Sequence, residues 1–471
     1  MVPSTRRTAL RVLGAAGAAS VAGCSALDLS GGPNERVPES VGTAWTPRAD
    51  AWQFPRSDLR NRAQFQTPFR TAPSAAWEHS TEVTGEVSVP VATPDVVVSA
   101  ESRDGVTRLR GHEPTDGTVR WRRDVEGPVS SVGGLADGSL VFGASGTDVG
   151  ALDVADGSVL WQRSLYEEVS SDVSAESLGA ASSTPAEFGA TPWMTPEEVY
   201  VQSSYGLHGL DSTDGSEQWR VSLSPDSEDE DAGPLGLAGG LAVASERVWA
   251  SYGEPEPALF EVFVDDGEAF VDTVETPESH VRRPVVTGDG PVYSVALSVG
   301  WDGSTGYGGP LVSVSGNGRF PDWASAGFAT RGRATRAGPV ATDGRRYVLP
   351  QLFRTGDGLE FGLIALHTTT GAVEWTAREP VEAPFADFEF FEHTALCDPI
   401  VAGDTVLVGY GVSPGYDEPR TDGVLAGYDV TSGERRWRRS TDLVPQHLAA
   451  AGNRLYVAGR GGVGGFARPH V

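Results

Sequence analysis

The chain has 471 residues, with 64 acidic side chains against 36 basic ones, and a formal net charge of −28. A chain of this length can bury one large core or several small ones. Nucleic-acid binding requires dense positive charge, so this balance excludes nucleic acid as a main partner.

The first 24 residues have the features of an export signal, which is set apart from fold analysis. Arg6 and Arg7 resemble the twin-arginine export motif, and an apolar run over residues 12–22 follows, too short to span a bilayer of about 30 Å. The run ends at Cys24 in a sequence similar to a lipobox, which implies lipidation of Cys24 and cleavage before it. We therefore expect a twin-arginine lipoprotein signal peptide over residues 1–24 and an extracytoplasmic protein anchored to the cytoplasmic membrane.

Residues 25–50 are rich in Gly, Pro, Ser and acidic residues, which predicts a flexible tether between the lipid and the folded domain. The rest of the chain, residues 51–471, is expected to be one domain. Lysine is absent and acid abundant, a composition that resembles proteins of salt-loving archaea. The acidic insertion over residues 224–231 is then interpreted as a solvated loop rather than a calcium site.

A short phrase recurs along this domain: an acidic residue, a turn, a glycine and, four residues later, a tryptophan. Five copies align at Gly117 and Trp121, Gly157 and Trp161, Gly215 and Trp219, Gly371 and Trp375, and Gly433 and Trp437. Turn residues between apolar β-forming runs predict a hairpin, with the glycine free to adopt positive φ. His367 takes the acidic position of its copy and His112 a leucine position, so both are interpreted as structural.

The spacing of the tryptophans predicts four-stranded repeats. Trp121 and Trp161 are 40 residues apart, and the gap of 156 between Trp219 and Trp375 has room for two degenerate copies, which end at Phe270 and Trp323. With Trp77 these make eight outer strands, and the three strands after Trp437 lack a fourth. The strand at Trp77 would complete that last blade and close the ring. The prediction is an all-β, eight-bladed β-propeller closed by its two ends, or a seven-bladed one if a degenerate copy is an insertion.

The repeat resembles the PQQ-type propeller repeat of quinoprotein dehydrogenases and of the bacterial outer-membrane assembly lipoprotein. The opening pattern Trp52, Asp58 and Asn61 is also similar to the start of those domains, and the resemblance covers about residues 50–468. It implies that the tryptophans dock between neighbouring blades and that the glycines make turns. Quinoprotein dehydrogenases would also need adjacent cysteines, whereas this chain has only Cys24 and Cys397.

No catalytic or metal-ligating pattern emerges from the other residues. The histidines have no paired spacing for zinc, and no serine lies in a nucleophile elbow. Cys397 is expected to be a buried, inert thiol. The long insertion over residues 166–196 is a candidate binding loop. The cluster of Phe385, Phe388, Phe390 and Phe391, with Phe361 upstream, is expected to pack on the edge of a blade, and a binding loop is the alternative.

These observations predict a monomeric, non-catalytic scaffold without a cofactor, which binds an unidentified protein partner at the cell envelope. Two alternatives remain: a dehydrogenase with pyrroloquinoline quinone and calcium in the channel, and a protein that binds a small ligand or polysaccharide.

Overall fold

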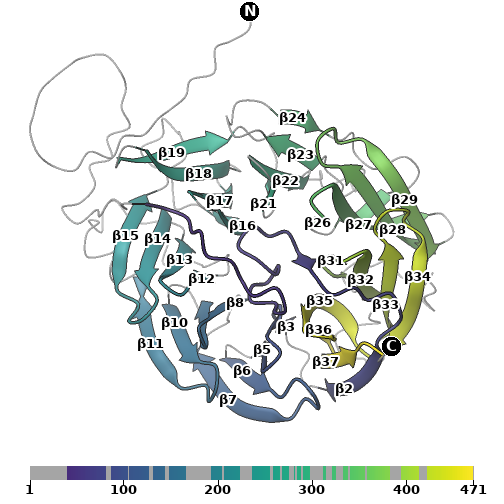
Figure 1. Ribbon diagram of the computed structural model, residues 1–471, viewed down its shortest axis with the longest axis horizontal. Coiled ribbons are helices and arrows are strands. Elements are labelled where there is room, and N and C mark those ends of the chain that lie inside the picture. Colours follow the sequence, from purple (N-terminus) through teal and green to yellow (C-terminus); the bar gives the residue numbers. More distant parts are fainter. Residues whose placement is uncertain are drawn as a thin grey trace, which may run out of the picture.

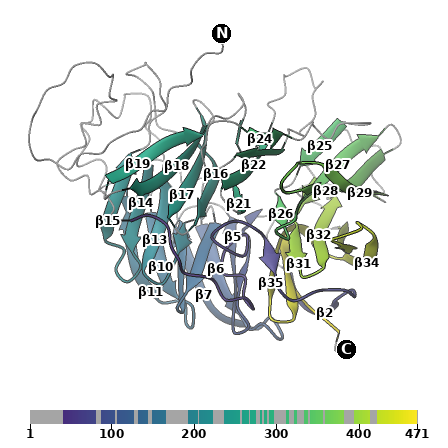
Figure 2. The same ribbon diagram turned by 45° about the horizontal axis from the view of Figure 1, so that its top comes forward.

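The computed structural model describes residues 40–80, 86–103, 106–126, 131–143, 148–165, 192–203, 206–222, 236–244, 246–254, 258–265, 268–274, 280–281, 284–287, 290–296, 311–314, 321–324, 333–337, 340–355, 358–381, 394–412 and 422–469. Their strands form eight sheets, which we number blades 1 to 8 in chain order. The sheets follow one another around a central axis (Figure 1), and in the oblique view they stand side by side around it (Figure 2).

Each blade is described from its inner to its outer strands. Blade 1 has β3 (Glu86–Val87), β4 (Val91–Ala92), β5 (Val97–Arg103), β6 (Val106–His112) and β7 (Val119–Glu126). Blade 2 has β8 (Ser131–Ala136), β9 (Ser139–Gly143), β10 (Asp148–Asp153) and β11 (Val159–Ser164). Blade 3 has β12 (Trp193–Met194), β13 (Glu198–Ser203), β14 (Gly206–Asp211) and β15 (Glu217–Ser222). Blade 4 has β16 (Gly236–Val243), β17 (Arg247–Glu254), β18 (Ala258–Asp265) and β19 (Glu268–Val274).

The second half of the ring continues the pattern. Blade 5 has β20 (His280–Val281), β21 (Val285–Thr287), β22 (Gly290–Ala296), β23 (Leu311–Val314) and β24 (Pro321–Ala324). Blade 6 has β25 (Arg333–Ala337), β26 (Ala341–Thr342), β27 (Arg346–Thr355), β28 (Gly358–His367) and β29 (Val373–Pro380). Blade 7 has β1 (Gln64–Phe65), β30 (Thr394–Leu396), β31 (Ile400–Ala402), β32 (Thr405–Val412), β33 (Asp422–Asp429) and β34 (Arg435–Thr441). Blade 8 has β35 (Val444–Ala451), β36 (Arg454–Arg460), β37 (Gly462–Ala467) and β2 (Ser74–Ser80).

Blade 8 joins the two ends of the chain, as the sequence predicted. β2 pairs antiparallel with β37, with Trp77 opposite Gly465 and Ser74 opposite Ala467. In Figure 1 the purple β2 lies beside the yellow β37. The all-β propeller class and its closure by the terminal strands are therefore confirmed, and the pairing covers edges that an open ring would expose.

The buried core lies between neighbouring blades. One apolar cluster joins Val98 and Leu109 of blade 1 to Leu140 and Phe142 of blade 2. Because consecutive side chains of a strand point to opposite faces of its sheet, each blade packs on both neighbours.

The boundary predicted at residue 50 is placed too late. Val41 is 2% exposed, and the Tyr200 hydroxyl donates to the Gly42 carbonyl over 2.9 Å. Residues 41–43 therefore pack on blades 3 and 4, where the Thr43 N–H also donates to the Ala244 carbonyl, and Asp50 reaches blade 8 through its carbonyl, which accepts the Gly452 N–H. The Gly- and Pro-containing composition of residues 40–50 reflects a segment that follows the surface of the ring rather than a free tether.

Candidate functional site

The repeat turn satisfies its own hydrogen bonds. In the copy around Gly157, which has φ of 72°, its N–H donates to the Asp153 carbonyl, and the Asp153 carboxylate accepts the Ala155 N–H over 2.8 Å. In another copy His367 replaces the aspartate, and its Nδ1 accepts the Thr369 N–H over 3.2 Å. The acidic position of the repeat thus requires an acceptor that caps the turn, a role that imidazole also fills.

The tryptophan of each complete repeat lies between two blades. Trp121 is 7% exposed, and its Nε1 donates over 2.8 Å to the carbonyl of Val154 in the next blade. A Cβ on Gly157 would lie 2.6 Å from the indole ring, and one on Gly111 of its own blade 2.2 Å from Nε1. Both glycines are therefore needed for the close approach of the ring.

The same contact recurs around the ring, and we call it the latch. It joins Trp77 to the Pro114 carbonyl, Trp161 to Ser212, Trp375 to Val430 and Trp437 to Phe69. Turn glycines of the next blade also lie against Trp161 and Trp375, namely Gly215 and Gly433. Gly371, with φ of 66°, makes the corresponding turn of blade 6.

Trp219 departs from this pattern because blade 4 carries a degenerate copy. Its Nε1 donates to the carboxylate of Glu198 in its own blade, and burial raises the pKa of Glu198. In blade 4 Phe270, which takes the tryptophan position, stacks on Phe263 of the same sheet with ring centroids 5.4 Å apart.

An arginine two residues after the tryptophan adds a second contact to three latches. Arg123 donates to the Gly157 carbonyl over 3.0 Å, Arg163 to Asp214 over 3.3 Å, and Arg439 to Pro73 over 2.8 Å. These arginines were not predicted, although arginine occupies this position in three of the five aligned copies.

The latch predicts that replacing two turn glycines with alanine lowers the free energy of unfolding by different amounts. Gly215 has φ of 71° and a Cβ there would lie 2.5 Å from Trp161, whereas Gly344 has φ of 88° with nothing within 4 Å. We expect Gly344→Ala to cost about 1–2 kcal/mol from backbone strain alone, and Gly215→Ala about 1–3 kcal/mol more from overpacking. Denaturant unfolding at constant salt measures both, and equal losses would contradict the latch.

A second structural feature is the segment over residues 50–65, which crosses the middle of the ring (Figure 1) and which we call the axis segment. It contacts the end of the innermost strand of each described blade, in the order of the blades around the ring. The contacts are Gly452 N–H to the Asp50 carbonyl, Trp52 N–H to Ala92, Leu135 N–H to Gln53, Phe54 stacked on Trp193 at 5.1 Å, Val243 N–H to Leu59, Val286 N–H to Arg60, Thr342 N–H to Arg62, and Val401 N–H to Ala63.

The axis segment lies on the face that carries the repeat turns. Strands alternate in direction within a blade, so the turn between the first and second strands and the turn between the third and fourth lie at the same end. We call this end the turn face. Connections between blades, and those between second and third strands, join strand ends at the opposite face.

Two polar side chains of the axis segment are fully buried and bind different blades. Arg56 donates to the carbonyls of Val340 and Asn61 and lies 3.2 Å from the Asp398 carboxylate. Asn61 donates through Nδ2 to the Leu241 carbonyl over 2.7 Å and to the Pro284 carbonyl over 2.8 Å. These side chains therefore join blades 4, 5, 6 and 7 at the axis.

The backbone of the axis segment is strained. Ser57, Asn61 and Ala63 have φ of 73°, 58° and 51° without being glycine. Left-handed conformations of such residues persist only where the surroundings impose them. The contacts with every described blade supply that constraint.

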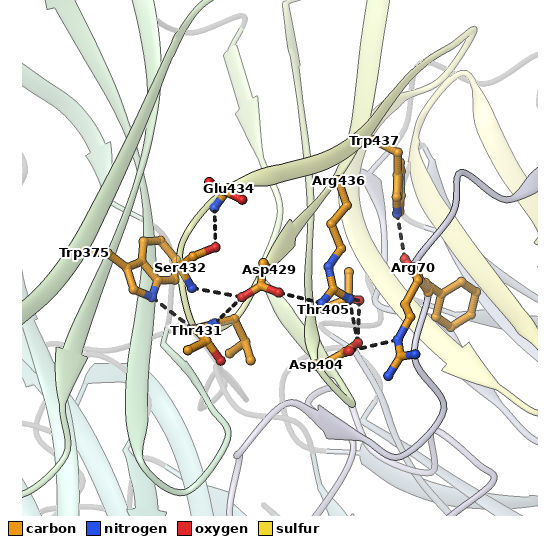
Figure 3. A network of polar contacts seen from close by, with 12 residues as sticks. Arg70, Trp375, Asp404, Thr405, Asp429, Thr431, Ser432, Glu434, Arg436 and Trp437 are labelled. Carbon is orange, nitrogen blue, oxygen red and sulfur yellow. Dashed lines mark hydrogen bonds and ion pairs between the residues drawn. The ribbon is translucent and has the colours of Figure 1, made fainter.

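An ion-pair network lies where the chain enters blade 8 (Figure 3). Arg436 contacts Asp404 and Asp429, each over 2.6 Å, and Asp404 also accepts from Arg70 over 2.8 Å. Hydrogen bonding from Arg436 lowers the pKa of Asp404, which keeps this carboxylate ionised. The network fastens residues 69–70 to blade 7, and we call this junction the seam.

A hydrogen-bonded chain of Ser203, His208 and Glu217 has the order of a hydrolase triad. Ser203 Oγ lies 2.8 Å from His208 Nε2, and His208 Nδ1 lies 3.1 Å from Glu217 Oε1. However, Ser203 is 2% and His208 1% exposed, and the serine hydroxyl also contacts the Gly206 carbonyl. The chain satisfies buried polar groups, and no substrate reaches the serine in this arrangement.

Of the other predicted sites, Cys397 lies within the described residues and the rest lie outside them. Cys397 is fully buried, with its N–H donating to the Gly409 carbonyl, and no group of three or more potential metal ligands occurs among the described residues. Within the same part of the chain, no helix is long and apolar enough to cross a membrane. Arg6, Arg7, Cys24, the acidic insertion and the phenylalanine cluster lie outside the described residues.

Comparisons with known proteins agree with this architecture. The family profile described as outer membrane protein assembly factor BamB matches residues 70–295 and 309–466. BamB from Moraxella catarrhalis is similar at 16% identity with a TM-score of 0.52, covering 85% of this chain and 98% of its own. No curated protein sequence matches the chain.

Quinoprotein enzymes share the fold as well. Quinohemoprotein alcohol dehydrogenase from Comamonas testosteroni is similar at 14% identity with a TM-score of 0.58, covering 90% of this chain and 82% of its own. A europium-containing methanol dehydrogenase is similar at 12% identity with a TM-score of 0.56, and the match covers 89% of this chain and 91% of its own. At such identities these likenesses show the fold alone.

Proposed function

Because the chain belongs to the family of outer membrane protein assembly factor BamB, we propose that it is a non-catalytic, extracytoplasmic scaffold that binds a protein partner. The observation that supports this role best is the asymmetry of the ring. Its turn face is closed at the axis by the chain's own residues 50–65, while the connections from β11 to β12, β29 to β30 and β32 to β33 join strand ends at the opposite face. Long connections on one face of a rigid fold commonly bind partners.

A quinone cofactor does not fit the turn-face end of the axis. Trp52, Phe54, Arg56 and Asn61 fill it with side chains no more than 1% exposed, and the Arg56 guanidinium and Asn61 Nδ2 already donate to backbone carbonyls. A planar ligand there would have to displace contacts between several blades. We therefore propose a function without a quinone at this position.

Crosslinking in intact cells at high salt tests the scaffold role. The chain has no lysine, so carboxyl-reactive or photoreactive linkers are required. We expect one reproducible partner, with crosslinks at residues 166–191 or 382–393 and few on the repeat turns. Crosslinks confined to the turn face, or no partner above a control propeller expressed at the same level, would contradict the proposal.

We also propose a lipid anchor at Cys24, on the sequence pattern that precedes it. Cys24→Ser should move the protein from the membrane fraction to the soluble fraction, because the lipid on Cys24 is the membrane attachment in the proposed arrangement. Cys397→Ser, which changes the buried thiol, is the matched control. A Cys24→Ser variant that stays in the membrane fraction would rule out the anchor.

A further inference from the structure

The indole of Trp77 contacts β37 and blade 1, outside its own strand, β2. A Cβ on Gly465 of β37 would lie 2.5 Å from the Trp77 ring, and one on Gly117 of blade 1 would lie 2.6 Å from it. His112 stacks on the indole at 5.8 Å, and the Pro114 carbonyl accepts its N–H over 3.0 Å. Blades 8 and 1 thus form a slot shaped for an indole.

Apart from this indole, the described side chains of β2 are exposed. Ser74, Ala75, Ala76 and Glu78 are exposed, whereas Trp77 is 8% exposed. β2 also follows the axis segment rather than β37, so no repeat turn links it to the strand with which it pairs. Its pairing with β37 therefore has the geometry of an extended peptide added to the edge of a sheet.

The entry to β2 is held by a buried contact at Phe69 and by an exposed ion pair at Arg70. Phe69 is fully buried, and its carbonyl accepts from the Trp437 indole over 2.6 Å. Arg439 donates to the Pro73 carbonyl, Arg468 to the Pro68 carbonyl over 3.2 Å, and Arg70 pairs with Asp404. The side chains of Arg70 and Asp404 are 69% and 35% exposed. Exposed ion pairs are weak and are screened by salt.

We propose that the edge of β37 is a binding site for an extended protein segment carrying a tryptophan, and that β2 occupies this site in cis. A partner strand would displace β2, pair with β37 through its backbone and place its indole between Gly465 and Gly117. Gly462, Gly464 and Gly465 leave the edge of β37 free of bulky side chains at these positions. Gly117 belongs to the turn between β6 and β7, so this strand site lies toward the turn face and would add a second contact to those that the scaffold makes through its opposite face. The proposal rests on the scaffold function, because it specifies one segment that the scaffold would bind.

The test uses the full chain and a dye-labelled synthetic peptide with the sequence of residues 72–80. The control peptide has alanine in place of its tryptophan. Fluorescence anisotropy is measured with the unmodified chain and with Arg70→Met, which alters an exposed residue of the seam. Arg346→Met is the matched control, because Arg346 pairs with Asp343 and Glu374 in blade 6, away from the seam.

Displacement predicts a definite order of affinities. Arg70→Met should bind the tryptophan peptide about three- to tenfold more tightly than the unmodified chain, since a weaker seam raises the fraction with a free edge. Arg346→Met should leave the affinity unchanged, and the alanine peptide should bind at least about tenfold more weakly, as expected from loss of a buried anchor. Hydrogen exchange should show that β2 amides open before those of β36.

Equal binding of the two peptides, no binding to any variant, or exchange of β2 only with global unfolding would overturn the proposal. These outcomes are distinct from failure of the scaffold function. A partner crosslinked to the opposite face together with peptides that do not bind would remove only the strand site, whereas peptide binding without any cellular partner would remove only the scaffold role.

Discussion

Replacing Trp161 with alanine is expected to lower the free energy of unfolding by about 3–5 kcal/mol, the range for truncating a buried aromatic side chain. The ring is 7% exposed, lies against Gly215 of the next blade, and donates to the Ser212 carbonyl over 2.9 Å. The substitution removes apolar contact between blades 2 and 3 and leaves the Ser212 carbonyl without this donor. Denaturant unfolding at constant salt measures the loss.

Leu160 is the matched control for this prediction. It precedes Trp161 in β11 and is 48% exposed, so Leu160→Ala changes the same strand without opening the junction between blades. Its effect should stay within about 0.5 kcal/mol, as for exposed positions in general. Equal losses for the two variants would mean that the latch does not carry the stability of the junction.

The repeat made most of the fold predictable from the sequence. Each glycine and tryptophan pair combines a turn that needs positive φ with a large apolar side chain at a constant distance, so the local signal and the packing requirement coincide at Gly157 and Trp121. Closure was predictable for a similar reason, because three unpaired strands at one end and one at the other leave only one arrangement without exposed edges.

The axis segment could not be predicted in the same way. Trp52, Asp58 and Asn61 were noticed only as a pattern that resembles the start of related domains, and their role depends on contacts with residues up to several hundred positions away. Arg56 illustrates this, since it lies beside Asp398 and binds the Val340 carbonyl. A segment without repeats, periodicity or local pairing carries no signal for such contacts.

The same reasoning explains the misplaced boundary of the tether. Composition reports whether a segment can build a core of its own, and residues 40–50 cannot. They are ordered because the ring provides the surface, as the contact of Tyr200 with Gly42 shows.

Replacing Asn61 with aspartate is expected to destabilise the protein by at least about 3 kcal/mol at pH 7, because it buries a carboxylate against two carbonyl oxygens. The nearby cation, Arg56, is already engaged with Asp398 and with the Asn61 and Val340 carbonyls. Nδ2 of Asn61 donates to the Leu241 and Pro284 carbonyls, and the side chain is fully buried. The substitution places a carboxylate oxygen against two carbonyl oxygens. Asn453→Asp, the same change at an exposed position, is the control and should be close to neutral.

The loss of unfolding free energy in Asn61→Asp should also depend on pH. The environment of the introduced carboxyl decides whether this loss grows or shrinks as the pH rises. Burial and the two carbonyls raise its pKa in the folded state above the unfolded value of about 3.9. Between these two pKa values the folded state binds more protons than the unfolded state, so stability falls as pH rises. The deficit of Asn61→Asp relative to the unmodified protein should therefore be smallest near pH 4 and grow until the pH passes the raised folded pKa. A deficit that is constant over this range would mean that the axis segment has moved away from blades 4 and 5 and that the carboxyl is hydrated.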